Sequence, residues 1–143
     1  MTDGQPTRRG DMSQPLVYID TSEVREGVLD ELKGAIEELV AFIDANEPQI
    51  LAYSVYFSED GSRMTVVHLH ADSASLDYHM DVAGPAFRRF ADLLTLSSIR
   101  VYGEPSDKAV GQLHEKARLL GCEEVTVQSP HTGFTRFGSG KKA

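Results

Sequence analysis

The sequence contains no tryptophan and only one cysteine, Cys122, among its 143 residues. A single cysteine excludes an intramolecular disulfide and any metal site built from several cysteines. No apolar run approaches the roughly 18–20 residues that span a membrane, and the first residues lack the apolar block of a secretory signal. Cations are also scarce, with 14 Lys and Arg against 22 Asp and Glu and a formal charge of −8. Because phosphate binding needs clustered cations, nucleic acid is an unfavourable partner. These absences predict a soluble, cytoplasmic protein that binds neither nucleic acid nor membranes.

The composition that remains is ordinary for a globular protein, with 41% hydrophobic and 25% charged residues. A chain of this length buries enough surface for one core, whereas two independent domains would be cramped. Residues 1–14 are polar and aperiodic, so we expect a flexible leader there. We expect one domain with an appended helix over residues 15–121, followed by a C-terminal extension over 122–143.

Strand and helix signals follow one another along the chain. Alternating β-branched and apolar residues predict strands, and apolar residues at helical spacing predict helices. The strands are predicted at 15–20, 49–58, 63–71 and 97–102, with a short one at 125–128. The helices are predicted at 22–46, 72–94 with a break at Gly84-Pro85, and 106–121. Asp60-Gly61 predicts a hairpin turn. The order β-α-β-β-α-β indicates an α+β, ferredoxin-like sandwich with helices on one face of an antiparallel sheet.

Alternation along each strand divides its side chains between two faces of the sheet. One face is almost entirely apolar and suits the underside of the helices. We expect the other face to collect polar and aromatic side chains: Tyr18, Ser54, Tyr56, His68, His70, Arg100 and Tyr102. Left uncovered, that face would be a large amphipathic patch. We therefore expect a homodimer, in which a second copy of the chain covers this face and encloses a cavity.

The residues around the paired histidines resemble a known family. The segment Val66–Ser73 (VVHLHADS), then His79-Met80 and Gly84–Phe87 (GPAF), is similar to the dimeric α/β-barrel proteins of the antibiotic-biosynthesis monooxygenase type. Val24–Gly27 and Glu47-Pro48 add to the resemblance, which spans about residues 16–102. Without tryptophan, the Asn-Trp-His set of the haem-degrading members cannot be carried over.

The resemblance implies two ferredoxin-like subunits forming a barrel around a pocket for a small-molecule ligand. It also implies cofactor-independent oxygenation, in which an electron-rich substrate anion itself reduces oxygen. On this basis we expect no cofactor, and a substrate that is aromatic or quinol-like.

His68 and His70 lie two residues apart on a strand, which places their imidazoles on one face, roughly 6–7 Å apart along the chain. They could act as acid–base groups toward a phenol-like substrate, with Arg100 or a tyrosine stabilising the oxyanion. The substrate-binding residues would then be Tyr18, Ser54, Tyr56, His79 and Tyr102. Alternatively, the histidines could be polar residues of a non-catalytic binding or regulatory module. A metal-dependent enzyme is a third alternative, but no motif identifies a further ligand, so we predict no metal.

Overall fold

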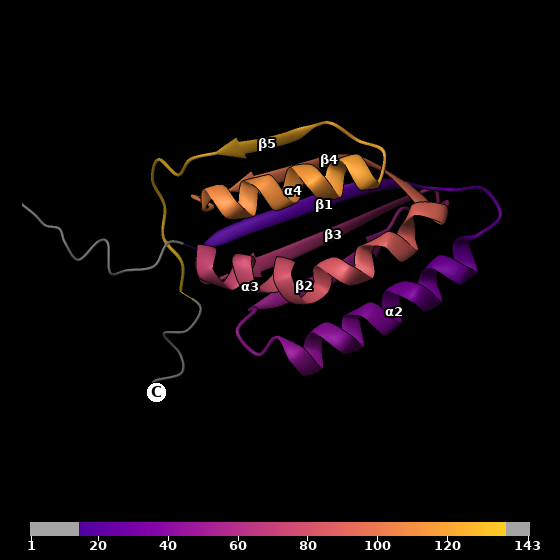
Figure 1. The fold of residues 1–143 in the computed structure, drawn as a ribbon, viewed down its shortest axis with the longest axis horizontal. Coiled ribbons are helices and arrows are strands. Elements are labelled where there is room, and N and C mark those ends of the chain that lie inside the picture. The colour runs from indigo at the N-terminus through magenta and orange to yellow at the C-terminus, as the bar shows by residue number, and fades with distance from the viewer. Residues whose placement is uncertain (1–14, 137–143) are drawn as a thin grey trace, which may run out of the picture.

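One sheet carries helices on one of its two faces in the computed structural model, which describes residues 15–136 (Figure 1). The expected leader, 1–14, and the last residues of the expected extension, 137–143, lie outside the described residues. The elements follow in the order β1 (Leu16–Val24), α2 (Leu29–Asn46), β2 (Ala52–Phe57), β3 (Arg63–His70), α3 (Ser73–Ala83), the 3-10 helix η1 (Gly84–Asp92), β4 (Leu94–Tyr102), α4 (Asp107–Leu119) and β5 (Val125–Gln128). Within residues 15–136, no helix combines the length and the apolar character that crossing a membrane requires.

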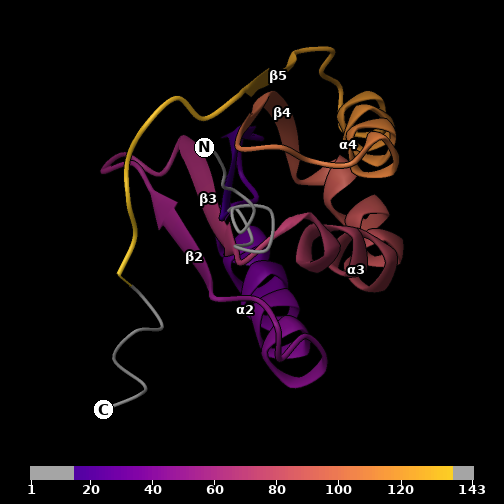
Figure 2. The same ribbon diagram turned by 90° about the vertical axis from the view of Figure 1, so that its left-hand side faces the viewer.

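The strand order is β2-β3-β1-β4-β5. The central strand β1 pairs antiparallel with both β3 and β4, whereas β5 joins the edge of β4 in parallel. The predicted ferredoxin-like arrangement is therefore confirmed, with β5 making the sheet mixed. Figure 2 shows α2, α3 and α4 on one side of the sheet. We call the sheet surface without helices the open face.

The predicted start of the first helix is wrong. Residues 22–24 complete β1, where Ser22 is buried and pairs with Met64 of β3. Pairing on both sides of β1 outweighs the helical spacing of the few apolar residues there. Gly27 then turns the chain with φ +83°, and the helix begins at Leu29. Its end at Asn46, just before Glu47-Pro48, is as predicted, because the residue before a proline disfavours helical geometry.

The other helix signals are largely confirmed. The Asp72 side chain accepts a hydrogen bond from the Ser75 amide at the start of α3, and Ser106 does the same for Ala109 in α4. Gly84-Pro85 does not end the second helix but converts it to the 3-10 helix η1, since proline lacks an amide hydrogen. Leu94, expected on that helix, instead opens β4.

The core lies between the helices and the face of the sheet that they cover. Burial alternates along β1 and β3, as expected for strands with one covered face. Each helical element contributes buried apolar side chains to this core: Leu32, Ile36, Leu39 and Ile43 from α2, Leu76 and Met80 from α3, Phe87 and Phe90 from η1, and Leu113 from α4. The same covered face also holds several polar side chains, and these form the site described below.

The backbone conformation and close packing at the end of β4 require a glycine at position 103. It has φ +140°, and an added Cβ would overlap the buried side chain of Leu16 and approach the Pro15 carbonyl oxygen to 3.1 Å. We expect Gly103→Ala to lower the free energy of unfolding by about 1–3 kcal/mol. Gly34 is a matched control, because it lies inside α2 with no atom near the added Cβ. Gly34→Ala should raise stability by about 0.5–1 kcal/mol. Denaturant unfolding compares the two variants, and equal effects would contradict the argument.

Candidate active site

The strand register shows that the predicted polar side chains do not share one face of the sheet, so that prediction is wrong. Tyr18 pairs with His68, which pairs with Tyr53, so these side chains share the helix-covered face. Ile19 pairs with Arg100 on the open face. Side chains alternate between the two faces within each strand, as predicted, but the sequence alone does not give the register between strands. The predicted polar residues of β1 and β3 face the helices, whereas those of β2 and β4 lie on the open face.

The covered face and the helices over it together hold a group of polar and aromatic side chains, which we call the interior cluster. Its members are Tyr18, Asp20, Glu47, Tyr53, His68, His70, Ser75, His79 and Lys116. All are buried except Tyr53, which is partly buried. Burial of the histidines is provided by the chain's own helices, so the expectation that a second subunit shields them is not needed.

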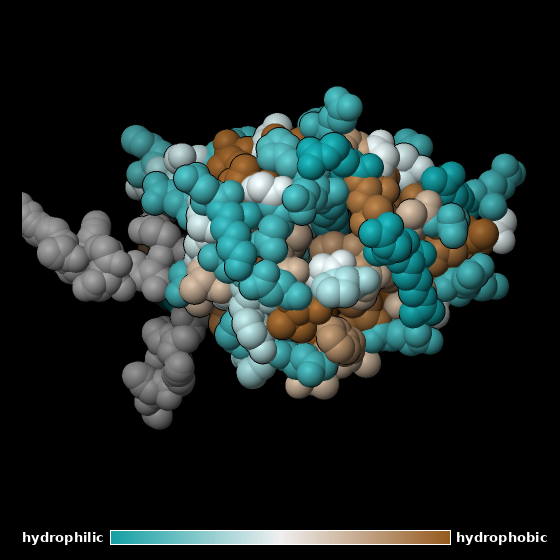
Figure 3. All heavy atoms as spheres, viewed as in Figure 1, coloured by the Kyte–Doolittle hydropathy of each residue, from teal (hydrophilic) through white to brown (hydrophobic). Residues whose placement is uncertain are grey.

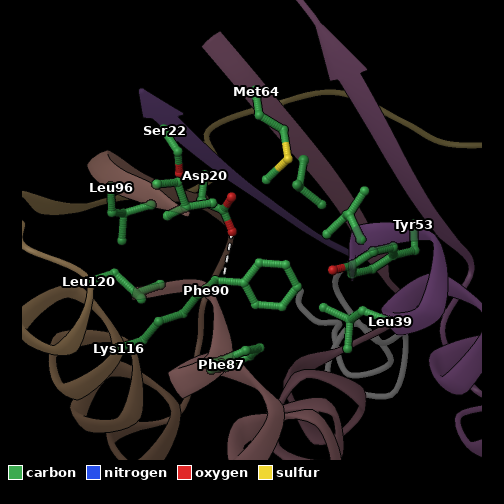
Figure 4. Close-up of a pocket in the computed structure, with 13 residues that line it drawn as sticks. Asp20, Ser22, Leu39, Tyr53, Met64, Phe87, Phe90, Leu96, Lys116 and Leu120 are labelled. Atoms are coloured by element: carbon green, nitrogen blue, oxygen red, sulfur yellow. Dashed lines mark hydrogen bonds and ion pairs between the residues drawn. The ribbon is translucent and has the colours of Figure 1, made fainter. Parts of the chain in front are cut away.

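A buried ion pair joins the appended helix α4 to the central strand. Lys116 Nζ donates to Asp20 Oδ2 across 3.0 Å and to Tyr18 Oη across 2.6 Å, and Figure 4 marks the first of these bonds. Lys116 also lies over the Phe87 ring, 4.2 Å from its centroid. Burial alone would raise the pKa of Asp20, but Lys116 and His68 more than offset this and hold that pKa well below its usual range. Asp20 is therefore an anion at neutral pH.

The two tyrosines of the cluster are neutral donors. Burial, followed by the negative charge of Asp20, raises the pKa of Tyr18 well above its usual range. Burial also raises the pKa of Tyr53, with Asp20 and Glu47 adding to the effect. Both hydroxyls therefore keep their protons at any physiological pH.

His68 is a neutral imidazole between these groups. Its ring stacks on Tyr18 with the centroids 3.9 Å apart, and its Nε2 lies 3.6 Å from Asp20 Oδ2. Burial lowers the pKa of His68 to about 3, while the neighbouring Asp20 opposes that shift. A proton accepted by His68 would produce an imidazolium beside the Asp20 carboxylate, which stabilises the charge but does not offset the cost of burying it.

Two further polar pairs lie behind His68. His79 Nδ1 donates to Glu47 Oε1 across 2.8 Å, with both side chains buried. His70 Nδ1 shares a 2.7 Å hydrogen bond with Ser75 Oγ. The His79 ring centroid lies 5.1 Å from that of His68, so the pairs form one continuous cluster.

The interior cluster contains most of the unsatisfied polar atoms of the described structure. Among residues 15–136, six buried side-chain nitrogen or oxygen atoms lack a hydrogen-bond partner: Glu47 Oε2, His68 Nδ1 and Nε2, His70 Nε2, His79 Nε2 and Gln112 Oε1. Five of the six belong to the cluster. Such atoms are uncommon in native proteins because each costs free energy. Their concentration makes the interior cluster the candidate functional site among the described residues.

A small internal cavity adjoins the ion pair, as Figure 4 shows. Its volume is about 30 Å³, room for one or two water-sized molecules. Its polar lining comes from Asp20, Ser22, Tyr53 and Lys116, and the rest is apolar. The cavity therefore places charged groups against largely apolar walls.

A surface groove lies outside the cavity and shares two of its walls. The groove has a volume of about 540 Å³ and is lined by residues of α3, η1 and α4. Phe87 and Lys116 line both the groove and the cavity, so these two side chains separate them. Figure 3 shows this helix-bearing side of the molecule, where hydrophobic atoms are visible between hydrophilic side chains.

The structure brings together only some of the predicted site residues. Tyr18, His68, His70 and His79 belong to the interior cluster. The remaining four, Ser54, Tyr56, Arg100 and Tyr102, do not lie in it. Arg100 is exposed on the open face, with a guanidinium nitrogen 3.7 Å from a carboxylate oxygen of Glu124. In a single chain Arg100 is therefore too remote to assist His68.

Sequence reasoning did not place Asp20, Glu47 or Lys116 in the site. A signal was present for Lys116, because it lies one turn after Leu113 on the inward stripe of α4, where a charged residue is unexpected. Glu47 gave no comparable signal, since a glutamate after a helix is usually solvated. Within residues 15–136, no three His, Cys, Asp or Glu side chains are arranged to hold a metal ion.

Comparison with solved structures confirms the fold. MupZ from Pseudomonas fluorescens is 14% identical, with a TM-score of 0.67 over 87% of this chain and 97% of that one. Rv0793 from Mycobacterium tuberculosis is 17% identical, with a TM-score of 0.56 over 66% and 98%. SnoaB, a cofactor-independent oxygenase from Streptomyces nogalater, is 13% identical, with a TM-score of 0.55 over 66% and 96%. No family model and no curated protein matches the sequence. At these identities the likeness establishes the ferredoxin-like fold expected from the sequence, and activity must be argued from the site.

Stability should fall as the pH drops below about 6.5. Burial lowers the pKa of both His68 and His70 to about 3, whereas in the unfolded chain each titrates near 6.5. Between these values the unfolded chain binds more protons, so acid favours unfolding. Each histidine should contribute a slope of up to about 1.4 kcal/mol per pH unit.

The test is denaturant unfolding between pH 7 and pH 5, a window above the range in which Asp20 loses its stabilising charge. His70→Asn should flatten the pH dependence. His114→Asn serves as the control, because His114 is exposed on α4 and should leave the slope unchanged. An identical slope in wild type and His70→Asn would contradict the prediction.

Proposed function

We propose that the chain is a small-molecule enzyme, a cofactor-independent monooxygenase that acts on an aromatic or quinol-like substrate at the interior cluster. The observation that carries the proposal is the placement of neutral His68 among the unpartnered atoms of the cluster, 3.6 Å from the carboxylate of Asp20, which itself lines the small cavity. SnoaB shares the fold and is a cofactor-independent oxygenase, which supports the reaction class by analogy.

His68 is the base in this proposal. Its neutral imidazole accepts the proton of the substrate hydroxyl, and Asp20 stabilises the imidazolium that results. The Glu47–His79 pair lies against the far side of His68 and limits the ring's movement. We therefore treat Asp20 as a positioning residue and His68 as the catalytic residue.

Lys116 and Tyr18 stabilise the substrate oxyanion. Lys116 Nζ is a cation in a site largely shielded from water, where electrostatic stabilisation is strong. Tyr18 remains protonated because its pKa is raised, so its hydroxyl can donate to an oxyanion. This role replaces the one expected for Arg100, which lies on the open face.

The substrate anion then reduces oxygen directly. Electron density at the activated carbon forms a C–O bond with dioxygen and gives a peroxide anion, which takes back the proton held by His68. When that carbon carries a hydrogen, loss of water leaves a carbonyl. The phenol's C–OH and C–H groups and O₂ thus become the two C=O groups of a quinone and H₂O, with four electrons lost by the substrate and four gained by oxygen. The apolar-walled cavity beside Lys116 has room for a molecule of the size of dioxygen.

The organic substrate is too large for the cavity and occupies the groove outside it. A volume of about 540 Å³ lies in the usual range for small-molecule sites. Movement of Phe87 and Lys116 would let the reacting hydroxyl reach Asp20 and His68. Return of these two side chains to their places would then exclude water from the substrate anion.

The small size of the cavity favours a second candidate function. With room for only one or two water-sized molecules, the interior is also compatible with a non-catalytic binding or regulatory module. In that case the groove would bind a ligand without turnover. Ligand-induced stabilisation without oxygen uptake would distinguish this function from the first.

We also propose that the open face is a homodimer interface. It presents partly buried apolar side chains from Val17, Ile19, Val67 and Leu69, and the Tyr56 side chain is 56% exposed. No helix within residues 15–136 covers this surface, and sheet-to-sheet packing of two copies would bury it. The compartment in which the protein acts remains a prediction from the sequence.

Sedimentation equilibrium should give twice the mass of one chain. Val67→Glu would place a charge at the centre of the proposed interface and should give a folded monomer, because an unpaired buried charge is costly. Phe42→Glu is the control, since Phe42 is a large exposed apolar residue on α2, on the other side of the sheet. It should leave the dimer intact. A monomeric wild type would refute the interface.

Oxygen consumption tests the enzymatic proposal. The purified protein should consume oxygen with at least one member of a panel of naphthohydroquinones and dihydroxynaphthalenes, above the rate of spontaneous oxidation. His68→Gln should lower that rate by roughly 10²–10⁴-fold, the usual contribution of a positioned base. His114→Gln, at an exposed position of α4, should leave the rate unchanged. Uptake that persists in His68→Gln would remove His68 from the mechanism, and no uptake with any panel member would reject the monooxygenase.

A further inference from the structure

We propose that the groove between η1 and α4 recognises the carboxylate of an aromatic hydroxy acid through Arg88 and Arg118. This inference rests on the proposed function, because it names the substrate class of the same site. It adds that the substrate has two ends, a hydroxyl that reaches the interior and an acid group that stays at the surface.

The groove is cationic on a chain that is otherwise strongly acidic. Its lining includes Arg88, Lys116 and Arg118 but only one acidic residue, Glu115, whereas the whole chain carries a formal charge of −8. A local reversal of charge of this kind concentrates anionic ligands at the groove.

Arg88 and Arg118 are exposed and are not used in ion pairs within residues 15–136. Two neighbouring surface cations are, by contrast, paired: Arg89 contacts Glu38 across 2.8 Å, and Lys108 contacts Asp81 across 3.0 Å. Lys116 is 8% exposed and its Nζ is engaged by Asp20 and Tyr18. In the proposed mechanism Lys116 faces the ligand's oxyanion at the inner end of the groove. The two arginines are therefore the cations left for a carboxylate at the surface, and a guanidinium matches a carboxylate in shape.

The remaining walls suit the rest of such a molecule. Met80, Phe87 and Leu119 supply apolar surface against which an aromatic ring can pack. The groove also contains Gln112, whose Nε2 donates to Asp81 while its buried Oε1 has no partner. That oxygen would accept a hydrogen bond from a second hydroxyl of the ligand.

The arrangement sets the ligand's orientation. Phe87 and Lys116 form the boundary with the cavity, so the hydroxyl to be deprotonated points toward them. The arginines hold the carboxylate outside, where its charge does not have to be buried. A neutral phenol of the same size would lack this anchor and bind less tightly.

Binding can be measured without turnover, using hydroxynaphthoate and naphthol as a matched acid and neutral probe. Isothermal titration under anaerobic conditions should show hydroxynaphthoate binding about tenfold more tightly than naphthol, the gain expected from charge-assisted hydrogen bonds at an exposed site. The difference should shrink as sodium chloride is raised, because salt screens surface charges.

Three variants locate the anchor. Arg88→Gln/Arg118→Gln should abolish the preference for hydroxynaphthoate and leave naphthol affinity within about twofold, since only a charge-dependent contact is lost. Arg118→Glu should reverse the preference. Arg89→Gln is the matched control, because Arg89 adjoins Arg88 in sequence but is paired with Glu38 away from this groove. It should keep the full preference.

The outcomes separate this inference from the proposed function. Equal affinities for the acid and the neutral probe, or an equal loss of preference in Arg89→Gln, would overturn the carboxylate site even if oxygen uptake is found. A preserved arginine-dependent preference without oxygen uptake would support the site and reject the monooxygenase. Circular dichroism confirms that each variant is folded, which is expected because both arginines are exposed.

Discussion

The buried ion pair between Lys116 and Asp20 is the interaction on which the rest of the site depends. Transferring two charges from water into the interior costs several kcal/mol per ion, and their mutual attraction recovers this cost only when the geometry is good. Here Lys116 satisfies both Asp20 and Tyr18, and it also lies against the Phe87 ring. Replacing a buried ion pair by apolar residues of similar volume is often neutral or stabilising in other proteins, so stability alone does not account for these two charges.

The ion pair also explains why the appended helix belongs to the functional domain. Asp20 lies on the central strand and Lys116 on α4, 96 positions later in the chain. A ferredoxin-like unit that ended after β4 would contain the carboxylate without its counter-ion. The charge of Asp20 in turn raises the pKa of Tyr18 and opposes the lowering of the pKa of His68 by burial. The protonation states of the cluster are therefore set jointly by the sheet and by the helix that follows it.

Much of the fold could be predicted from the sequence because its signals are local. The apolar stripe ending at Asn46, the Asp60-Gly61 turn and the helix starts near Asp72 and Ser106 depend on neighbouring residues, and all are confirmed. The site was only partly accessible, because it depends on register between strands. Tyr18 and His68 were identified, but grouping them with Arg100 required a pairing that alternation cannot supply. Glu47 and Asp20 act through partners distant in sequence, and no local pattern marks such contacts.

The parallel strand β5 has a consequence for how the protein avoids aggregation. An unpaired sheet edge is a template for adding further strands, and β5 occupies the edge that β4 would otherwise present. It is only four residues long, is preceded by Glu123 and Glu124, and is followed closely by Pro130, which has no amide hydrogen to donate. The short length of β5, the negative charges before it and the proline after it all oppose the addition of a further strand. Growth of the sheet into a polymer is thus blocked on this side, and the opposite edge, β2, is where a foreign strand would have to attach.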